Sequence, residues 1–431
     1  MTKHTNTLVF AFISFLLFSC ASNKPVYDNK VANDTLPAAY ATKSVMNFSN
    51  VTGWEDGLKP KAPEGFEVNP FYGGLENPRW LYELPNGDIL VAESNSNHSF
   101  LEQFGAIFIG ANKSNNLKKS ADRISLLRDT NNDGTADERH ILVEDLNQPL
   151  GMLLMNDYLY IANTDALVRY NYKVGETKLT GKSEKIMDFP SGKHNRHWTR
   201  NIIANKDESK IYVAIGSGSN VAEYGVANEI LRADILEINP DGSAMRIFAD
   251  GIRNPVGMDW NPDTDELWTV VNERDELGDN LVPDYLTHVE ENGFYGWPYV
   301  YFGQHDDPRI GDDPAVVKNT IVPDYALGAH TASLGLKFYT GDAFPSKYKN
   351  GAFIAQHGSW NRSTLAGYKV IFVPFKNGKP AGKSEDFLTG FVENLDKDKV
   401  HGRPVCVIQD HEGNVLVTDD TSGMIWRVSA K

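Results

Sequence analysis

The sequence predicts an all-β protein, and the fold class that it favours is a six-bladed β-propeller. One hairpin pattern occurs six times, in which a strand with alternating apolar residues meets an Asn-Gly, Asn-Asp or Asp-rich turn and a second apolar strand. Each copy ends in a polar or Gly-rich loop. Six equivalent hairpins are typical of six blades around a channel, whereas a two-sheet sandwich, the alternative, rarely repeats one motif this often.

The predicted hairpins follow one another along most of the chain. They cover residues 80–94, 152–164, 201–217, 257–273, 335–358 and 405–420. A propeller brings the equivalent loops of all its blades to one end of the channel. We therefore expect the residues just before each hairpin to share one pocket, although they lie far apart in the sequence.

The first residues predict targeting rather than fold. Lys3 and His4 precede an apolar run over residues 8–18, which is too short for a membrane-spanning helix of roughly 20 residues. The run ends in Leu-Phe-Ser-Cys, which resembles a bacterial lipobox in which Cys20 is lipidated. An ordinary signal peptide with an incidental cysteine is the alternative.

These features divide the chain into three expected parts. Residues 1–19 are expected to be a lipoprotein signal peptide, residues 20–61 a polar tether, and residues 62–431 the propeller. The protein is then expected in the bacterial cell envelope, as a periplasmic or outer-membrane lipoprotein that meets the membrane only through its lipid. The one other cysteine, Cys406, lies in an apolar strand and is expected to be a small buried side chain.

The charge of the chain argues against a nucleic-acid partner. The sequence holds 57 acidic and 42 basic residues, a formal net charge of −15. Phosphate backbones require a basic surface, which this composition does not favour. An anionic ligand would need a local basic pocket.

Arg and His residues supply such a pocket, because they stand before most of the hairpins. They are Arg79, His197, Arg200, Arg253, His330, His401 and Arg403, and His357 and Arg362 follow the second strand of the fifth hairpin. Arg binds carboxylates through two parallel hydrogen bonds, so several of these groups would hold a planar polycarboxylate. The alternative is that each of them pairs with a carboxylate of its own blade.

Several motifs resemble one known family. These segments are GLENPRWLYELPNGDILVAES, HWTRN, GIRNPVGMDWNP, NERDELGDNLVPD, NGFYGWPYVYFG and HGSWNR. They are similar to the sorbosone/glucose dehydrogenase family of soluble quinoproteins, six-bladed propellers that use pyrroloquinoline quinone (PQQ), and most similar to its sorbosone-dehydrogenase-like branch. The resemblance implies an oxidoreductase that oxidises a sugar or a related alcohol or aldehyde and passes electrons to an unidentified acceptor.

The resemblance also implies roles for single residues. His197 matches the base that takes the substrate's hydroxyl proton while a hydride moves to the quinone, and His194 is a minor candidate. Arg253, implied to be catalytic as well, and Asn254 match residues that hold the quinone. The implied cofactor-binding set is Arg200, Arg253, Asn254, His357, His401 and Arg403. At position 401 the glucose dehydrogenases have an Arg.

Calcium is the second cofactor that the resemblance implies, bound partly by backbone oxygens after the fourth hairpin. The residues concerned are Glu273, Arg274, Asp275 and Asp279. Oxygen ligands suit this ion, and a solvated acidic loop is the alternative.

A second calcium loop is predicted from spacing alone. Asp129, Asn131, Asp133 and Asp137 alternate around a Gly, as in calcium-binding turns. The twelfth position is His140 rather than Glu, so the segment is no EF-hand. A plain Asx-rich turn is the alternative.

Two other functions stay open at this point. One is a calcium-dependent hydrolase of the lactonase kind, which needs carboxylates and Asn around the channel. The other is a non-catalytic, carbohydrate-binding propeller lipoprotein.

Overall fold

The chain folds into a nearly all-β structure whose strands gather in several small sheets. The computed structural model describes residues 36–97, 110–114, 117–310 and 314–431. The helical elements within these ranges are short, namely η2 (Ala111–Ser114), η3 (Val226–Asn228), α2 (Pro314–Asn319), η4 (Ser346–Tyr348) and η5 (Leu395–Lys397). The predicted all-β class is thus confirmed.

Six sheets of four antiparallel strands carry the fold, and one of them gains a fifth, parallel strand. The first sheet contains β3 (Pro78–Glu83), β4 (Ile89–Glu93), β5 (Arg123–Arg128) and β6 (Glu138–Val143). The second contains β7 (Met152–Met155), β8 (Tyr158–Ala162), β9 (Ala166–Asn171) and β10 (Glu184–Asp188). The third is β11 (Arg200–Ala204), β12 (Ile211–Ile215), β13 (Asp234–Ile238), β14 (Arg246–Asp250) and β18 (Gly293–Phe294).

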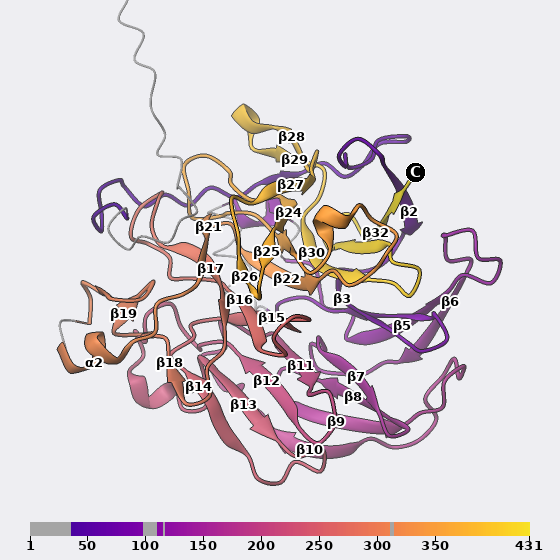
Figure 1. Cartoon of the computed structure of the whole chain (residues 1–431), viewed down its shortest axis with the longest axis horizontal. Helices are drawn as coiled ribbons and strands as arrows, with labels where there is room; N and C mark the ends of the chain where they lie inside the picture. The colour runs from indigo at the N-terminus through magenta and orange to yellow at the C-terminus, as the bar shows by residue number, and fades with distance from the viewer. Residues whose placement is uncertain (1–35, 98–109, 115–116, 311–313) are drawn as a thin grey trace, which may run out of the picture.

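The remaining three large sheets follow in chain order. The fourth sheet contains β15 (Pro255–Trp260), β16 (Leu267–Val271), β17 (Pro283–His288) and β21 (Tyr325–Ala329). The fifth contains β22 (Ser333–Phe338), β23 (Ala352–Gln356), β24 (Lys369–Val373) and β27 (Glu385–Leu388). The sixth joins the two ends of the fold, since β30 (Pro404–Gln409), β31 (Val415–Asp419) and β32 (Met424–Ala430) are completed by β2 (Phe66–Tyr72), as the neighbouring β2 and β32 in Figure 1 show.

Smaller sheets decorate these six. They are β1 (Asn50–Val51) with β29 (Lys399–Val400) and β28 (Val392–Asn394), β19 (Val300–Tyr301) with β20 (His305–Asp306), and β25 (Phe375–Lys376) with β26 (Lys379–Pro380).

All six predicted hairpins form, each as the first two strands of a large sheet. The second strands β4, β12, β16, β23 and β31 are buried at every position. They are therefore apolar runs rather than alternating patterns, because neighbouring sheets cover both of their faces. The Asn-Gly turn of the first hairpin works because Gly87 adopts a φ of 85°, which glycine tolerates without strain.

The first strands of successive sheets lie against one another. Contacts run from β3 to β7, β11, β15, β22 and β30, and β30 returns to β3. Glycines permit this approach, because a Cβ at Gly257 would lie 2.5 Å from the Leu334 backbone oxygen, and one at Gly335 would lie 2.7 Å from that of Val405. In Figure 1 the sheets accordingly follow one another around a common middle.

The apolar core lies between sheets rather than at a single centre. One cluster joins the first two sheets around Leu90, Leu126 and Leu159. Another joins the fifth and sixth sheets around Phe353 and Trp426. Each sheet therefore depends on its neighbours to bury its faces.

The end of the expected tether packs against the body. β1 pairs in parallel with β29, and the Trp54 ring contacts Phe391 and Trp426 edge-on. Residues 36–61 therefore contribute structure, whereas the predicted signal peptide and Cys20 lie outside the described residues. Cys406 is fully buried, as its apolar strand predicted.

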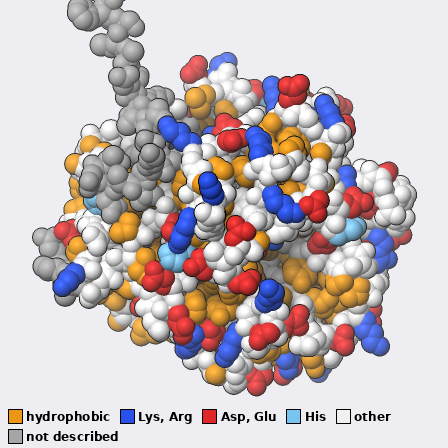
Figure 2. All heavy atoms as spheres, viewed as in Figure 1, with side chains coloured by type: hydrophobic (Ala, Val, Ile, Leu, Met, Phe, Trp, Pro, Cys, Tyr) orange, Lys and Arg blue, Asp and Glu red, His pale blue; other side chains and the backbone are white. Residues whose placement is uncertain are grey.

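Two surface properties bear on partners. Within the described ranges, no helix is long and apolar enough to cross a membrane. Figure 2 shows acidic and basic side chains interspersed over one face of the molecule.

Candidate active site

A cavity of about 500 Å³ lies where several loops that flank the inner strands meet. His197, before β11, and Arg253 with Asn254, before β15, line it together with residues that follow β16. Small-molecule sites have volumes of about 300–1,000 Å³. The predicted convergence of the third and fourth hairpin loops is therefore found, and His330 joins them from the loop before β22.

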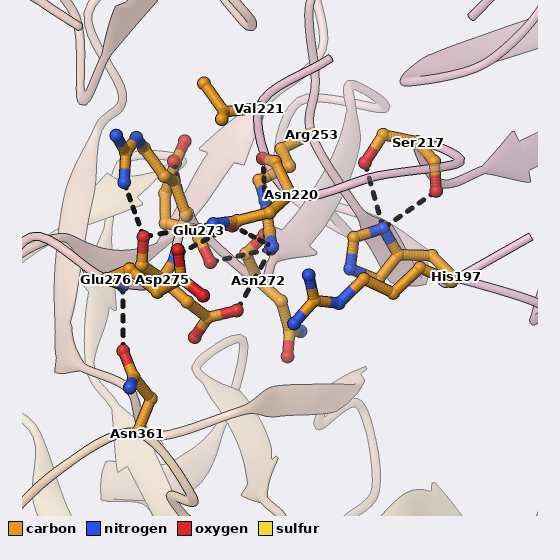
Figure 3. Close-up of polar contacts among 12 residues, drawn as sticks. His197, Ser217, Asn220, Val221, Arg253, Asn272, Glu273, Asp275, Glu276 and Asn361 are labelled. Carbon is orange, nitrogen blue, oxygen red and sulfur yellow. Dashed lines mark hydrogen bonds and ion pairs between the residues drawn. The ribbon is translucent and has the colours of Figure 1, made fainter. Parts of the chain in front are cut away.

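One nitrogen fixes the His197 ring. Its Nδ1 lies 2.9 Å from both the backbone oxygen and the Oγ of Ser217 (Figure 3). A carbonyl oxygen only accepts, so Nδ1 carries the hydrogen and Nε2 keeps the lone pair. Burial lowers the pKa of His197 well below its ordinary value, and the charges of Arg253 and Arg196 add to this effect. The ring is therefore neutral at neutral pH.

A buried carboxylate anchors the loop that holds His197. The Ser217 hydroxyl donates to the Ser219 backbone oxygen at 2.7 Å, and the Ser219 hydroxyl donates to Glu229. Glu229 also accepts from the Gly218 N–H at 2.6 Å. This chain of hydrogen bonds sets the position of the acceptor to which the histidine is bound.

The Arg253 guanidinium is buried, and protein acceptors take all of its five N–H groups. Nη1 donates to the backbone oxygens of Asn272 and Glu273 at 3.0 and 2.6 Å. Nε and Nη2 donate to Asn220 at 3.1 and 2.8 Å, and Nη2 also to Asp275 at 3.2 Å (Figure 3). Arg253 therefore shapes the cavity wall and lends it positive charge, and it offers no free N–H to a bound carboxylate.

Asp275 lies between two cationic groups. Its Oδ1 is 3.4 Å from His330 Nδ1, and its Oδ2 is 3.2 Å from Arg253. Burial opposes ionisation, but the His330 hydrogen bond and the Arg253 charge hold the pKa of Asp275 below its ordinary value. Burial alone would lower the pKa of His330, whereas Asp275 raises it. The two side chains therefore form an ion pair in the cavity wall.

Two other carboxyl groups of the wall titrate close to neutral pH. Burial raises the pKa of Glu273 to about 7 and that of Asp284 to about 6. Asp284 accepts from the Ser333 N–H at 3.0 Å and from the Thr331 hydroxyl at 2.9 Å. The charge of the cavity therefore changes over the physiological pH range.

Asn254 presents a buried acceptor without a protein partner. Its Oδ1 has no hydrogen bond within the part of the chain that the structure describes, and the side chain is almost fully buried. A Cβ at Gly216 would lie 2.2 Å from this oxygen and 2.6 Å from the His197 Cβ, so the glycine lets both side chains meet there. The oxygen itself faces Gly216 and is closed to solvent, so Asn254 meets the cavity through the rest of its side chain.

Arg200, predicted to bind the cofactor, lies outside the cavity wall. Its guanidinium donates to four acceptors of the loop leading into β11, namely the oxygens of Pro190, His197, Thr199 and the Asn195 Oδ1, at 2.7–2.9 Å. Burial lowers the pKa of Arg200 to about 9. Arg200 thus stabilises the loop that carries His197, because its guanidinium is hydrogen-bonded within that loop and does not extend to the cavity.

His357 and Arg403 belong to a separate buried cluster around Asp420. His357 Nε2 is 3.0 Å from Asp420, which also accepts from Arg79 at 2.6 Å. Arg403 donates to the His357 backbone oxygen at 3.0 Å. Burial, with the charge of Arg403, lowers the pKa of His357 to about 4. Neither predicted cofactor residue lines the cavity, and His357 follows the alternative of pairing with a blade carboxylate.

His401 is also held away from the cavity. Its ring stacks on Trp54 with centroids 4.7 Å apart, and its Nδ1 is 2.9 Å from the Gly53 backbone oxygen. The N-terminal segment thus binds the His401 side chain, which was expected to stand at the cofactor in the place of an arginine.

The predicted calcium site after β16 does not fit the hydrogen bonding there. The Glu273 backbone oxygen accepts from Arg253, and that of Asp275 accepts from Arg274. Asp279 accepts from the Ser363 N–H at 3.0 Å. Guanidinium groups therefore already bind the oxygens that were expected to bind the ion.

The turn from Asp129 to Asp137 forms the side-chain-to-backbone hydrogen bonds of an Asx-rich turn, which calcium-binding loops share, so the predicted calcium loop stays a prediction. Asp129 accepts from the Gly134 N–H at 2.7 Å, and Asn131 accepts from the Asp133 N–H at 2.9 Å. Asp137 accepts from Thr130 at 2.8 Å. In the ranges that the structure covers, no three His, Cys, Asp or Glu side chains are grouped to hold a metal ion.

Several residues of the cavity wall were not predicted as site residues. Met46, Phe48, Ala111, Leu117, Arg196 and Ala332 lie outside the motifs quoted above, whereas Asn272, Glu276, Asp284 and Trp360 lie within them. Arg196 directly precedes His197, so its place before a hairpin was a usable signal. Met46 and Phe48 gave none, because apolar side chains in a polar segment carry no chemical motif, whereas Trp360 lies in the HGSWNR motif.

Comparison with known proteins identifies the family. The model of a domain of unknown function, DUF7133, matches residues 86–359, and a TrAA12-like model matches residues 302–431. An uncharacterized protein from Borreliella burgdorferi is 32% identical over 381 residues, which cover 85% of this chain and 90% of that protein.

Two characterised relatives match over shorter stretches. A pyrroloquinoline quinone-dependent pyranose dehydrogenase from Coprinopsis cinerea is 30% identical over 124 residues, 25% of this chain and 16% of the enzyme. The aldose sugar dehydrogenase YliI from Escherichia coli is 31% identical over 199 residues, 45% of this chain and 46% of the enzyme. The chain thus spans less than half the length of either enzyme.

Solved structures share the fold. The Trichoderma reesei family AA12 enzyme has a TM-score of 0.70 at 19% identity, over 90% of this chain and 100% of that one. The PQQ domain of Coprinopsis cinerea pyranose dehydrogenase in its holo form has a TM-score of 0.67 at 20% identity, over 89% and 100%. The chain therefore belongs to the DUF7133 family, and its predicted resemblance to the soluble PQQ-dependent sugar dehydrogenases is confirmed.

Proposed function

We propose that this protein is a PQQ-dependent oxidoreductase that oxidises a sugar or a related alcohol or aldehyde. The observation that carries the proposal is a neutral His197, whose Nε2 keeps its lone pair, in the wall of a cavity that Arg196 and Asn254 also line. The names of the pyranose and aldose dehydrogenases among its relatives support the same chemistry.

The cavity has the volume of a small-molecule site, and of its two arginines Arg196 is the one whose side chain is partly exposed. Arg196, whose side chain is 40% exposed and whose Nη1 lies 3.8 Å from Glu223, would pair with one of the cofactor's carboxylates. Bound PQQ would supply a quinone that accepts a hydride, which carries both electrons of the oxidation. Arg253 would act through its charge and by fixing the wall, since its N–H groups are taken.

His197 accepts the substrate's hydroxyl proton at Nε2. The ring is oriented by Ser217, and its low pKa keeps it in the accepting form. Transfer of the proton to Nε2 would place a second positive charge near Arg253, and the ion pair of Asp275 offsets that charge from the same wall. The proposal needs no Ca²⁺ at the Glu273 and Asp275 backbone oxygens, which guanidinium groups already occupy.

The proposed architecture is a single closed ring of six blades. The cycle of contacts among the six first strands supports it, as does the sheet that joins β2 to β32. The proposed location is the cell envelope, where a lipid on Cys20 would anchor the protein. This location is supported only by the sequence of the first twenty residues.

A lactonase-like hydrolase has one feature in its favour, because Asn254, Asn272 and Asp284 line the cavity. Such an enzyme needs these oxygens for a metal ion. Asp284, however, is bound to the Thr331 hydroxyl and the Ser333 N–H. We therefore favour the oxidoreductase.

The test is single-turnover reduction of bound PQQ by an aldose. His197→Ala should bind PQQ normally and reduce it about 10²–10⁴-fold more slowly, which is the usual contribution of a positioned base. His194→Ala is the matched control, since that ring stacks on Tyr224 at 3.6 Å and lines a different hollow. Normal reduction in His197→Ala, or no PQQ binding by the wild-type protein, would rule out the proposal.

A further inference from the structure

The N-terminal segment over residues 44–54, which we call the crossing segment, runs over the loops beside the cavity. Its Asn47 N–H donates to the Trp360 backbone oxygen at 2.7 Å, and the Asn47 side chain donates to Asp398 at 2.9 Å. The Asn50 N–H donates to the Asp398 backbone oxygen at 2.7 Å. The segment is therefore tied to the loop after β23 and to the loop before β29.

Asn361 ties the same segment to the cavity wall. Its Nδ2 donates to the Val45 backbone oxygen at 3.2 Å, and its Oδ1 accepts from the Glu276 N–H at 2.8 Å (Figure 3). Glu276 lines the cavity. One side chain thus sets the distance between the crossing segment and the loop that carries the acidic residues.

The crossing segment contributes apolar side chains to the cavity. Met46 and Phe48 line it, and Met46 is 56% exposed although nothing in a tether requires a large apolar residue. The Phe48 ring stacks on Trp360, with centroids 5.9 Å apart and planes at 16°. The Arg196 guanidinium lies 5.7 Å from the same indole. Trp360 therefore lies where the apolar side of the cavity meets the cationic one.

We propose that Met46 and Phe48 form the substrate-binding side of the cavity and take the apolar C–H face of a pyranose ring. The proposal rests on the proposed sugar-oxidising function. A pyranose has a flat apolar face and a rim of hydroxyls, which matches an aromatic surface next to His197 and Asn254. A quinone with three carboxylates needs donors along its edge, and these two side chains have none.

The inference makes the N-terminal segment part of the active site rather than a spacer. It also explains why residues 44–54 are fixed by hydrogen bonds on both sides of Phe48. A free tether would gain nothing from losing its conformational freedom in this way.

The test measures the binding of glucose and of PQQ in separate calorimetric titrations of the full chain. Glucose is titrated twice, into the protein without PQQ and into the protein loaded with reduced PQQ. Phe48→Leu and Met46→Ser should each weaken glucose binding about threefold to tenfold, the range that one aromatic contact supplies, and leave PQQ affinity unchanged. Met245→Ser is the matched control, because Met245 is 41% exposed and does not line the cavity. Circular dichroism melting of each variant checks that it is folded.

The outcomes separate the two proposals. Unchanged glucose affinity in both variants, absence of glucose binding by the wild-type protein in either state, or a loss of PQQ affinity instead would overturn the role of the crossing segment. Glucose binding that depends on Phe48 in a protein that never binds PQQ would uphold that role and reject the oxidoreductase.

Discussion

The Nδ1 atom of His197 lies 2.9 Å from the backbone oxygen of Ser217, and this contact decides which ring nitrogen can act as a base. The Ser217 hydroxyl lies at the same distance and passes the connection on to Ser219 and then to Glu229. A buried carboxylate outside the cavity thus controls the orientation of the ring.

Replacing Glu229 should misplace His197 without touching the substrate. Glu229→Ala removes the acceptor of the Gly218 N–H and of the Ser219 hydroxyl, so the Ser217 loop loses its anchor. We expect PQQ reduction to slow about tenfold while PQQ affinity is kept, since geometry is lost but the base remains. Glu229→Gln keeps an oxygen acceptor and should restore most of the rate. Nitrogen NMR of the His197 ring should report mixed tautomers in Glu229→Ala, and an unaltered tautomer with a normal rate would contradict the prediction.

The rate of PQQ reduction should resist acidification. The folded-state pKa of His197 lies below the ordinary value of about 6.5, so the accepting form persists as the pH falls through that value. The contribution of His197 to the rate should decline at lower pH, where the imidazole is protonated. The unfolded chain takes up its proton near pH 6.5, so this residue lowers stability as the pH falls below that value. Glu273 and Asp284 of the same wall titrate at about 7 and about 6, so the pH series of single-turnover rates is measured in a Glu273→Gln, Asp284→Asn background. A midpoint at or above 6.5 in that background would be incompatible with a buried neutral base.

Arg253 should matter for stability first. Arg253→Ala removes five hydrogen bonds and leaves Asp275 with His330 alone, so the free energy of unfolding should fall by about 3 kcal/mol or more. Arg196→Ala, at an exposed side chain, should change it by less than about 0.5 kcal/mol and yet lower PQQ affinity about tenfold. Urea denaturation and PQQ titration of the two variants decide the assignment. If the Arg253→Ala protein is stable and its PQQ affinity alone is weakened, Arg253 binds the cofactor directly.

His401 should behave as a structural residue. His401→Ala loses the stacking on Trp54 and the contact with Gly53, so the free energy of unfolding should fall by about 1 kcal/mol. PQQ affinity should not change, because the ring lies outside the cavity wall. Titration of the variant with PQQ tests this, and a drop in affinity without a loss of stability would restore the cofactor role that its position suggested.

The sequence by itself determined the six hairpins, but of the residues before them it placed only those of the third, fourth and fifth hairpins correctly at the cavity, since Arg79 and Arg403 lie outside its wall. Alternating apolar residues and turn residues such as Asn86 and Gly87 are local signals, so all six hairpins were predictable without knowledge of their neighbours. The meeting of His197, Arg253 and Asn254 followed from their equivalent places before hairpins. Calcium stays a prediction at the loop from Asp129 to Asp137, and at Glu273 the backbone oxygen already accepts from Arg253.

Only the tertiary structure decided which cationic side chains line the cavity, and that the N-terminal segment lines it too. Arg200 and Arg253 both precede a hairpin, but each guanidinium is surrounded by backbone oxygens that its own sequence position does not reveal. The polar composition of residues 36–61 suggested a tether, whereas parallel pairing of β1 with β29 and the stacking of Phe48 on Trp360 fix it to the body. The physical reason is that a side chain binds the acceptors nearest in space, and segments some 300 residues apart in the chain supply them here.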